Sequence, residues 1–364
     1  MIVLGLMSGT SMDGLDCCLS DVNISNNNQL NFKIIDYSTI EYKKNIKMKI
    51  VECISNKNRD LNSLDLLLGE LFFNLSKKFL NHRQVDLIAS HGQTISHRDR
   101  EYSIQIGHPK YLSRYYNVPI IYNFRKNDID AGGSGAPLVP YLDWLLFRKS
   151  NQNVVAINLG GISNFSFIKK DCSKNNVIGF DMGPGMCLID LYVRKNWKID
   201  FDNNGELSSK GIKSNELLKD LMLNSFIQKI PPKSATVEDY GMEFLTKYIE
   251  KYNEINKYDF LRTLVNFTSE LIQKNLNNFI GKVDLKDANI IVGGGGAKNL
   301  ILINDLKKSL NTNIQSIHYN GINIDNKESF LMCVLGCTTY NNIPNNMPSV
   351  TGADREVICG ELYE

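Results

Sequence analysis

The sequence predicts an α/β fold of two domains, because the chain is long enough for two cores and one strand pattern occurs twice. At 364 residues the chain exceeds the usual size of a single domain. Residues 1–22 read as a strand, a glycine-rich turn and a second strand, and residues 154–168 repeat this order about 150 residues later. No repeat is visible by plain identity, so the pattern alone predicts a duplicated domain with a nucleotide between the halves.

The first turn, within Leu4–Asp16 (LGLMSGTSMDGLD), combines glycines with hydroxyl and carboxyl side chains. Backbone N–H groups that converge in such a turn bind anions such as phosphate. Asp13 and Asp16 suit a phosphate site only if a hard cation lies between them, as magnesium does beside a nucleotide. The alternative is a plain tight hairpin whose acids are solvated.

Composition and charge argue against several other classes of protein. The 41 basic and 39 acidic residues give a net charge of +2, so we expect no strong attraction to nucleic acid or to a membrane surface. The apolar run at residues 1–6 is too short for a secretory signal, and no run approaches the roughly 20 residues of a membrane span. The eight cysteines form no CxxC pair, which favours free thiols in a reducing cytoplasm.

The first half continues with a third strand at residues 31–42 and two helices, the clearer of which has Asn62 or Ser63 as its cap. A short buried strand at residues 85–89 then delivers SHGQT, residues 90–94, at its carboxyl end, where ligands bind in layered α/β folds. His91 therefore either contacts a ligand or caps the local turn. Two further strands are expected at residues 104–109 and 118–124.

The loop at residues 123–140 (NFRKNDIDAGGSGAPLVP) has the composition of a hinge or of a lip over a binding site. Arg125 lies at its edge. Its guanidinium suits a fork to a carboxylate or phosphate, and an ion pair with Asp128 or Asp130 is the equal alternative.

In the second half, an apolar strand brings Asp181 to a glycine-bracketed turn (FDMGPG), where Pro184 suits the first position of a helix. A carboxylate between a strand end and a helix start is placed as a general base, although an N-cap aspartate fits the same pattern. Residues 200–240 are rich in loops and suit a lid.

The remaining elements begin with a helix at residues 258–279. A strand at residues 288–292 then precedes GGGGAKN, residues 293–299, which is a weak nucleotide-contact signal. A helix at residues 327–339 carries Glu328. A rigid surface loop at residues 341–353 leads to a short C-terminal strand.

Eight motifs in one order then point to a known family. They are MSGTSMDGLD (7–16), SHGQT (90–94), DIDAGGSGAPLVP (128–140), NLGGISN (158–164), FDMGPG (180–185), PPKS (231–234), GGGGAKN (293–299) and PSVTGA (348–353). In this order they resemble the anhydro-N-acetylmuramic acid kinases over essentially the whole chain.

The resemblance implies a two-domain actin-like ATPase (ribonuclease H-like) fold with mixed five-stranded sheets flanked by helices and an interdomain cleft. Residues 1–128 and about 341–364 would form the N-terminal lobe, and residues from about 129 to 340 the C-terminal lobe.

The resemblance further implies an enzyme of cell-wall recycling. It uses ATP, magnesium and water to convert 1,6-anhydro-N-acetylmuramate into N-acetylmuramate 6-phosphate and ADP, as a homodimer without nucleic-acid partners. Asp181 would be the catalytic base, Asp13 and Asp16 would hold magnesium, and His91, Arg125 and Glu328 would contact the sugar, with Lys233 as a second candidate for steering its carboxylate. The implied ATP contacts are Gly9, Thr10, Ser11, Met12, Asp13, Gly14, Leu15, Asp16, Gly160, Gly161, Gly293, Gly294 and Gly295.

The chain departs from the family pattern at a few positions. We expect Thr and Asn in place of Met182 and Met186, Asp in place of His108 and Asn123, and Gln in place of Ser134. Two alternatives remain open: a kinase of another amino sugar, and an ATP-binding regulator without catalysis.

Overall fold

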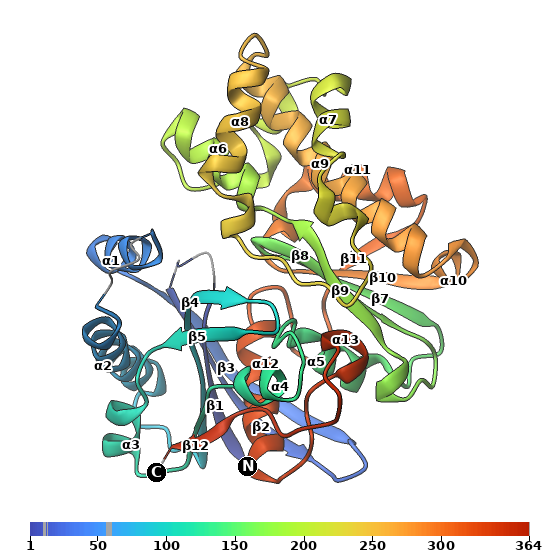
Figure 1. Cartoon of the computed structure of the whole chain (residues 1–364). Coiled ribbons are helices and arrows are strands. Elements are labelled where there is room, and N and C mark those ends of the chain that lie inside the picture. Colours follow the sequence, from blue (N-terminus) through green and yellow to red (C-terminus); the bar gives the residue numbers. More distant parts are fainter. Residues whose placement is uncertain (10–11, 13, 56–59, 364) are drawn as a thin grey trace. The chain divides into compact units, whose positions relative to one another are not determined.

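The computed structural model describes residues 1–9, 12, 14–55 and 60–363. The chain forms two compact units (Figure 1): unit 1 is Met1–Leu146 with His318–Glu364, and unit 2 is Phe147–Ile317. The boundaries expected from the sequence, at residues 128 and 341, both fall within unit 1. No helix in the described ranges is long and apolar enough to cross a membrane.

Unit 1 is built on a mixed sheet in the order β12-β6-β4-β1-β2-β3, with β5 paired to β4. Strand β1 is antiparallel to β2 and parallel to β4, and β6 is parallel to β4. The sheet thus has seven strands where five were expected. The strands are β1 (Ile2–Ser8), β2 (Gly14–Ile24), β3 (Leu30–Glu41), β4 (Leu87–Arg98), β5 (Tyr102–Ile106), β6 (Ile120–Tyr122) and β12 (Glu361–Tyr363).

Alternate residues of β1 face two different layers of helices. Leu4 and Leu6 are fully buried in a core that also contains Leu68 and Phe72 of helix α2. On the opposite face, a Cβ atom added to Gly5 would lie 2.1 Å from the carbonyl oxygen of Ser329 in α12. A glycine is therefore required where α12 crosses β1. The helices of unit 1 are α1 (Lys44–Ser55), α2 (Leu61–Leu80), α3 (Lys110–Tyr116), α4 (Lys126–Asp130), α5 (Val139–Phe147), α12 (Lys327–Tyr340) and α13 (Pro348–Thr351).

Three local expectations for unit 1 are wrong. SHGQT does not follow a strand but lies inside β4, because β5 pairs with residues 93–98 and extends that strand. The cap of α2 is Asp60, whose carboxylate accepts from the amide of Ser63. Residues 341–353 are no surface loop, since they include α13 and bury Asn345 and Asn346.

Unit 2 repeats the strand order of unit 1. Its sheet runs β11-β10-β7-β8-β9, and the corresponding strands of unit 1 are β6-β4-β1-β2-β3, with the same parallel and antiparallel pairs. The strands are β7 (Asn153–Leu159), β8 (Ile162–Ile168), β9 (Ile178–Pro184), β10 (Ala288–Gly293) and β11 (Ile314–Ser316). The predicted α/β fold class, with a mixed sheet flanked by helices in each unit, is confirmed.

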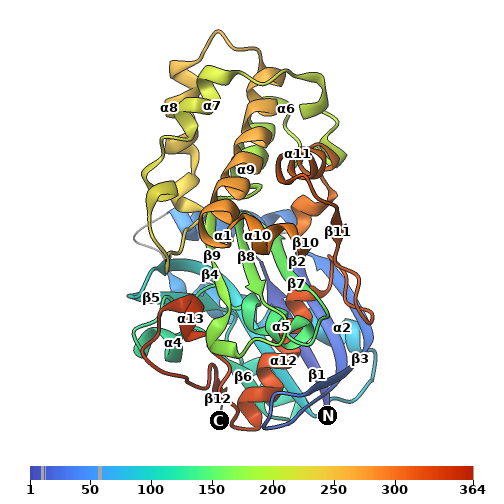
Figure 2. The same cartoon turned by 90° about the vertical axis from the view of Figure 1, so that its right-hand side faces the viewer.

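The long helix α9 (Lys257–Phe279) organises the packing of unit 2, with α11 (Leu300–Leu310) beside it in Figure 2. Asn256 caps α9 by accepting from the amides of Tyr258 and Asp259. Arg262 of α9 forms a two-pronged ion pair with Asp305 of α11, with N···O distances of 2.6 and 2.8 Å. The other helices are α6 (Cys187–Trp197), α7 (Asn215–Leu221), α8 (Met242–Lys251) and α10 (Lys282–Lys286).

Candidate active site

The first glycine turn joins β1 to β2, and a glutamine of β4 supports its base. The Oγ atom of Ser8 donates to Oε1 of Gln93 at 2.6 Å, and Nε2 of Gln93 donates to the carbonyl oxygen of Gly9 at 3.3 Å. Met12 has a φ of 58°, and its amide donates to the Gly9 carbonyl at 3.1 Å. Sequence reasoning missed Gln93, although its place in the SHGQT motif was the available signal.

The candidate residues around this turn differ in what they can offer a ligand. Leu15 is fully buried, so only its backbone can reach a nucleotide. At Gly14, an added Cβ atom would lie 2.4 Å from the Ile40 carbonyl oxygen, so the position must be glycine. Thr10, Ser11 and Asp13 lie outside the described residues.

Asp16 is the described member of the expected magnesium pair. It lies on β2 opposite Thr39, whose hydroxyl donates to Oδ1 at 2.5 Å. The described residues contain no group of three or more His, Cys, Asp or Glu that could hold a metal ion. One half-buried carboxylate still fits magnesium, because the ion commonly takes one or two carboxylates and fills its other positions with phosphate and water oxygens.

The second glycine turn, Gly160 and Gly161, joins β7 to β8 and is fixed by the start of α6. The amide of Met186 donates to the Gly160 carbonyl at 2.9 Å, and the amides of Gly185 and Cys187 donate to the Gly161 carbonyl at 2.9 and 3.1 Å. A Cβ atom on Gly185 would lie 2.3 Å from the Gly160 carbonyl oxygen. The turn is therefore held through its carbonyls.

The third glycine segment, Gly293–Gly296, follows β10 and packs against the same region of unit 2. Gly294 has a φ of 78°, and a Cβ atom there would lie 2.7 Å from Oδ1 of Asn158. By contrast, a Cβ atom on Gly295 would meet no atom within 4 Å. A glycine that faces open space, next to a Gly294 that is packed against β7, suits contact with a flat ligand group.

Asp181 lies within β9, and its carboxylate accepts hydrogen bonds from the segment at residues 234–235. Its side chain is 5 % exposed, and Oδ2 accepts from the Ala235 amide at 3.0 Å and the Ser234 hydroxyl at 3.1 Å. The expected place between a strand end and a helix start is wrong, because β9 runs to Pro184 and α6 begins at Cys187 after its cap residue Met186. Asp181 therefore does not cap α6, and Pro184 does not begin it.

Asp181 belongs to a row of three polar residues that crosses neighbouring strands of the sheet. Asn158 of β7, Asn164 of β8 and Asp181 of β9 are direct partners across the sheet, so their side chains share one face. Oδ1 of Asn164 is buried and has no hydrogen-bond partner among the described residues. Such a buried acceptor is a position where an ordered water or a ligand hydroxyl is expected.

His91 and Arg125 are brought together in unit 1. Nδ1 of His91 donates to the Gly92 carbonyl at 2.9 Å, and its Nε2 accepts from Nε of Arg125 at 3.2 Å. Nη1 of Arg125 donates to the Gly135 carbonyl at 2.8 Å. Burial, together with the nearby Arg125 charge, lowers the pKa of His91 to about 3. The imidazole is thus neutral and orients the guanidinium.

Asp128 and Asp130, the two acids considered as partners of Arg125, have different surroundings. Asp130 pairs with exposed Lys126 at 2.8 Å. Asp128 is 1 % exposed and ties the glycine-rich loop to the C-terminal segment. Its carboxylate accepts from the Gly135 amide at 2.8 Å, the Thr351 hydroxyl at 2.8 Å and Nδ2 of Asn346 at 2.9 Å.

Glu328 is half-buried in the first turn of α12, and its neighbour Lys327 anchors that turn. The ammonium of Lys327 lies 2.6 Å from Oδ1 of Asp143 in α5, and both side chains are buried. This ion pair fixes the start of α12 and with it the position of Glu328.

Comparison with known proteins identifies the family. The family model described as anhydro-N-acetylmuramic acid kinase matches residues 1–364. A curated relative of that name from Clostridioides difficile (strain 630) is 38 % identical, with 100 % of this chain and 98 % of the relative covered. A second, from Bacillus thuringiensis (strain Al Hakam), is 34 % identical, with 100 % and 98 % covered. The chain belongs to the anhydro-N-acetylmuramic acid kinase family.

Membership confirms the resemblance and makes the chain an ATP-using sugar kinase. Among solved structures, the chain is similar to the activator of the 2-hydroxyisocaproyl-CoA dehydratase from Clostridium difficile with bound ADPNP. That likeness has a TM-score of 0.45 and 13 % identity, with 94 % of this chain and 96 % of that chain covered.

The residues that depart from the family pattern are packed or hydrogen-bonded in the structure. Met186 packs beside Gly296, where its Sδ would lie 2.8 Å from an added Cβ atom, and Met182 is fully buried. Nδ1 of His108 accepts from the Lys110 amide at 3.2 Å, and Asn123 donates to Glu361 at 2.9 Å. Asn123 also has a φ of 56°, which asparagine tolerates better than most residues.

The remaining departure, Ser134, is buried in the glycine-rich loop and donates to the Ala136 carbonyl at 2.5 Å. Each departure from the family pattern therefore has a packing or hydrogen-bonding role.

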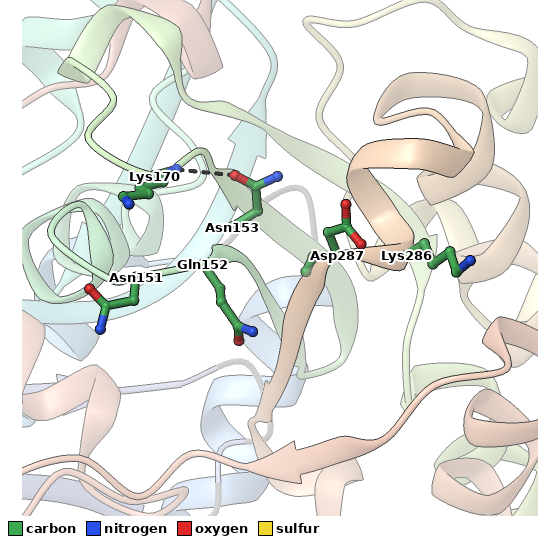
Figure 3. A pocket seen from close by; sticks show the side chains of 7 residues that line it. Asn151, Gln152, Asn153, Lys170, Lys286 and Asp287 are labelled. Atoms are coloured by element: carbon green, nitrogen blue, oxygen red, sulfur yellow. Dashed lines mark hydrogen bonds between the residues drawn. The ribbon is translucent and has the colours of Figure 1, made fainter.

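A separate pocket of about 470 Å³ lies in unit 2, at the ends of the strands that are away from Asn158 and Gly293 (Figure 3). It borders the first residues of β7 and β10, whereas Asn158 and Gly293 stand at the other ends of those strands. The amide of Lys170 donates to Oδ1 of Asn153 at 3.1 Å, as the dashed line in Figure 3 marks. Its lining residues are Asn151, Gln152, Asn153, Lys170, Lys286, Asp287 and Ala288. None of them is a predicted site residue of the kinase.

Proposed function

We propose that this chain converts 1,6-anhydro-N-acetylmuramate, ATP and water into N-acetylmuramate 6-phosphate and ADP, with Asp181 as the general base. The observation that carries this assignment is the Asp181 carboxylate itself. It is buried, and its Oδ2 is held by two donors while the unpartnered Oδ1 of Asn164 lies on the same face of the sheet. Such a pair suits the orientation of one water molecule.

The chemistry follows from the substrate, which has no free 6-hydroxyl group. Water attacks the anomeric carbon while the bond from that carbon to the 6-oxygen breaks, and Asp181 takes the proton from the water. The anomeric centre is inverted, as in inverting glycoside hydrolysis. The freed 6-oxygen then attacks the γ-phosphorus, and the oxygen that bridges it to the β-phosphorus leaves with ADP.

The phosphoryl transfer requires positioning and charge neutralisation above all. We assign the phosphates to the Gly9–Asp16 turn and to Gly160 and Gly161, and the adenosine to Gly293–Gly295. Asp16, and Asp13 by its motif, would hold magnesium, which neutralises phosphate charge when bound. The support of the Gly9 carbonyl by Gln93 keeps the first turn in place for this role.

The sugar contacts fall to unit 1 residues in this proposal. Arg125 is oriented by His91 and the Gly135 carbonyl, and its fork suits the lactyl carboxylate. His91 acts through Arg125, and Glu328 faces the sugar hydroxyls. We also assign a cytoplasmic location, in line with the eight cysteines being free. A homodimer is assigned from the family resemblance.

The test is the fate of oxygen from labelled water. The purified protein with ATP, magnesium and the anhydro sugar should give ADP and a 6-phosphosugar that carries one label at the anomeric hydroxyl, formed as a single anomer before mutarotation. Asp181→Asn should lower kcat by at least about 10³-fold, because the base is lost. Asp200→Asn makes the same change at an exposed position of unit 2 and should leave kcat unchanged.

Two results would contradict the proposal. A product without label would indicate a kinase of a sugar with a free hydroxyl. Nucleotide binding without any sugar-dependent ADP would indicate a regulator.

A further inference from the structure

A buried lysine anchors the segment that grips the proposed base. Lys233 directly precedes Ser234 and Ala235, the two donors to Asp181, and its own carbonyl accepts from the Asp181 amide at 3.3 Å. The Lys233 side chain is 4 % exposed. It is therefore not available to steer a substrate carboxylate, which was one expectation for it.

Three phenylalanine rings surround the Lys233 ammonium. Its Nζ lies 5.2 Å from the ring centre of Phe180, 5.0 Å from that of Phe226 and 5.7 Å from that of Phe279. Nζ also donates to Oδ1 of Asn275 at 3.1 Å and to the Phe226 carbonyl at 3.5 Å. Each ring contributes a cation–π attraction, and the attraction is stronger away from water.

The charges around this cage are few. Within the described residues, Lys233 has no carboxylate oxygen within ion-pair distance, unlike buried Lys327 of unit 1. The charged groups that act on it are Asp181, which favours the ammonium, and Lys229, which disfavours it. Burial is the larger effect, and it lowers the pKa of Lys233 to about 8. The side chain is thus charged at neutral pH and neutral a little above it.

We propose that Lys233 is a positioning residue for the general base: its caged ammonium fixes residues 231–235 so that Ser234 and Ala235 hold Oδ2 of Asp181. This inference rests on the proposed function, because it assumes that Asp181 takes the proton from water. The cage joins Phe180, the neighbour of Asp181 in β9, to Phe279 at the end of α9 and to Phe226 beside the segment. The base is therefore positioned through its own strand and through the segment opposite.

The ammonium should affect activity and stability in opposite directions. Loss of the proton removes the cation–π attraction and the attraction to Asp181, so the grip on Oδ2 weakens and kcat falls. The unfolded chain keeps this proton up to the ordinary lysine pKa of 10.5, so it binds more protons than the folded chain between about pH 8 and that value. The contribution of Lys233 to stability therefore rises with pH in the same window.

The experiment compares three variants over pH 7 to 9. Lys233→Met removes the charge but keeps an unbranched chain that packs on aromatic rings. Lys233→Arg keeps a charge that does not titrate. Lys229→Met is the matched control, because Lys229 lies on the same ring of Phe226 at 5.4 Å but is exposed and does not touch Asp181.

Wild type should lose about ten-fold in kcat between pH 7 and pH 9, as one group with a pKa of about 8 loses its proton. Lys229→Met should show the same fall moved to higher pH, because the charge that disfavours the Lys233 ammonium is gone. Lys233→Met should have a kcat at least about ten-fold below wild type at pH 7, with little change up to pH 9 and with KM for ATP within about two-fold. Lys233→Arg should keep its own pH 7 value up to pH 9. The Tm difference between wild type and Lys233→Met should shift in favour of wild type as pH rises.

Several results would overturn the inference and leave the proposed function intact. They are a Lys233→Met enzyme with the kcat of wild type, one that keeps the wild-type fall with pH, or a wild-type kcat that is flat from pH 7 to pH 9. The last result decides the matter even if Lys233→Met does not fold. An active Asp181→Asn enzyme would instead overturn the proposed function, whatever Lys233 does.

Discussion

The two units share one strand order, but each surrounds its buried lysine with different groups. In unit 1, the Lys327 ammonium lies 2.6 Å from the Asp143 carboxylate, so acid and base neutralise each other and join α12 to α5. In unit 2, Lys233 is surrounded by aromatic rings, and Asp181 is held instead by a hydroxyl and an amide.

The difference separates a scaffold from a site. In unit 1 the acid and the lysine bond to each other and join two helices, whereas in unit 2 the lysine orders the segment whose hydroxyl and amide position the acid. The comparison predicts that the pair of Lys327 and Asp143 supports stability and that the Lys233 ammonium supports activity.

The largest expected effect comes from breaking the ion pair of unit 1. Asp143→Ala leaves the Lys327 ammonium buried without that carboxylate and should lower the free energy of unfolding by about 3–5 kcal/mol in urea titrations. The double variant Asp143→Leu with Lys327→Met should recover most of the loss. If Asp143→Ala lost less than about 1 kcal/mol, the pair would not have the scaffold role that the comparison gives it.

Asp128→Asn should have the next largest effect. The carboxylate accepts three hydrogen bonds inside unit 1, and an amide nitrogen in its place would face a donor. We expect a loss of about 2–3 kcal/mol in the free energy of unfolding. Thr351→Val removes only one of these donors and should lose about 1 kcal/mol. Equal losses for the two variants would show that the hydroxyl alone secures the loop.

His91 predicts an acid sensitivity of unit 1, at a lower pH than the window in which Lys233 acts on stability. Its pKa of about 3 in the folded state lies below the ordinary 6.5, so the unfolded chain binds more protons between these values, and stability falls as the pH is lowered through that window. From pH 7 to pH 5 the loss should be about 2 kcal/mol. His91→Gln cannot titrate, so the difference in stability between the two proteins should shrink by this amount on acidification. A constant difference would contradict a neutral His91.

The smallest effect tests a part of unit 2 that bears no buried charge. Asn256→Ala removes the side chain that accepts from two amides at the start of α9 and should lower the free energy of unfolding by about 1 kcal/mol. The pH profile of kcat should stay that of wild type, because the cage contains the other end of this helix. A changed profile would mean that the alkaline fall reports helix stability in general.

The repeated strand order could be predicted from the sequence because it depends on local pattern. The alternation after Gly14 and the repeat at residues 154–168 each mark a hairpin, and both pairs of antiparallel strands are present. The helix expected at residues 258–279 is α9 almost to the residue, since its apolar positions recur at helical spacing.

The sequence could not place features that depend on distant partners. The strand at residue 87 extends to Arg98 only because β5 pairs with it, and no local signal announces that pairing. The cage of Lys233 combines Phe180, Phe226 and Phe279, which are far apart in the sequence. The sequence therefore suggested a lysine that steers the substrate and gave no sign that it is buried. The motif identified Asp181, but the sequence could not predict that Ser234 and Ala235 donate hydrogen bonds to its carboxylate.

Strand β4 gives two different ligand contacts one common support. Gln93 holds the turn assigned to phosphate, and His91, two residues earlier, holds the arginine assigned to the sugar. A shift of β4 on the arrival of one ligand would therefore alter the affinity for the other, and thermodynamic reciprocity requires the same factor in both directions. We expect nucleotide and sugar to bind cooperatively in the wild type and independently once Gln93 is replaced.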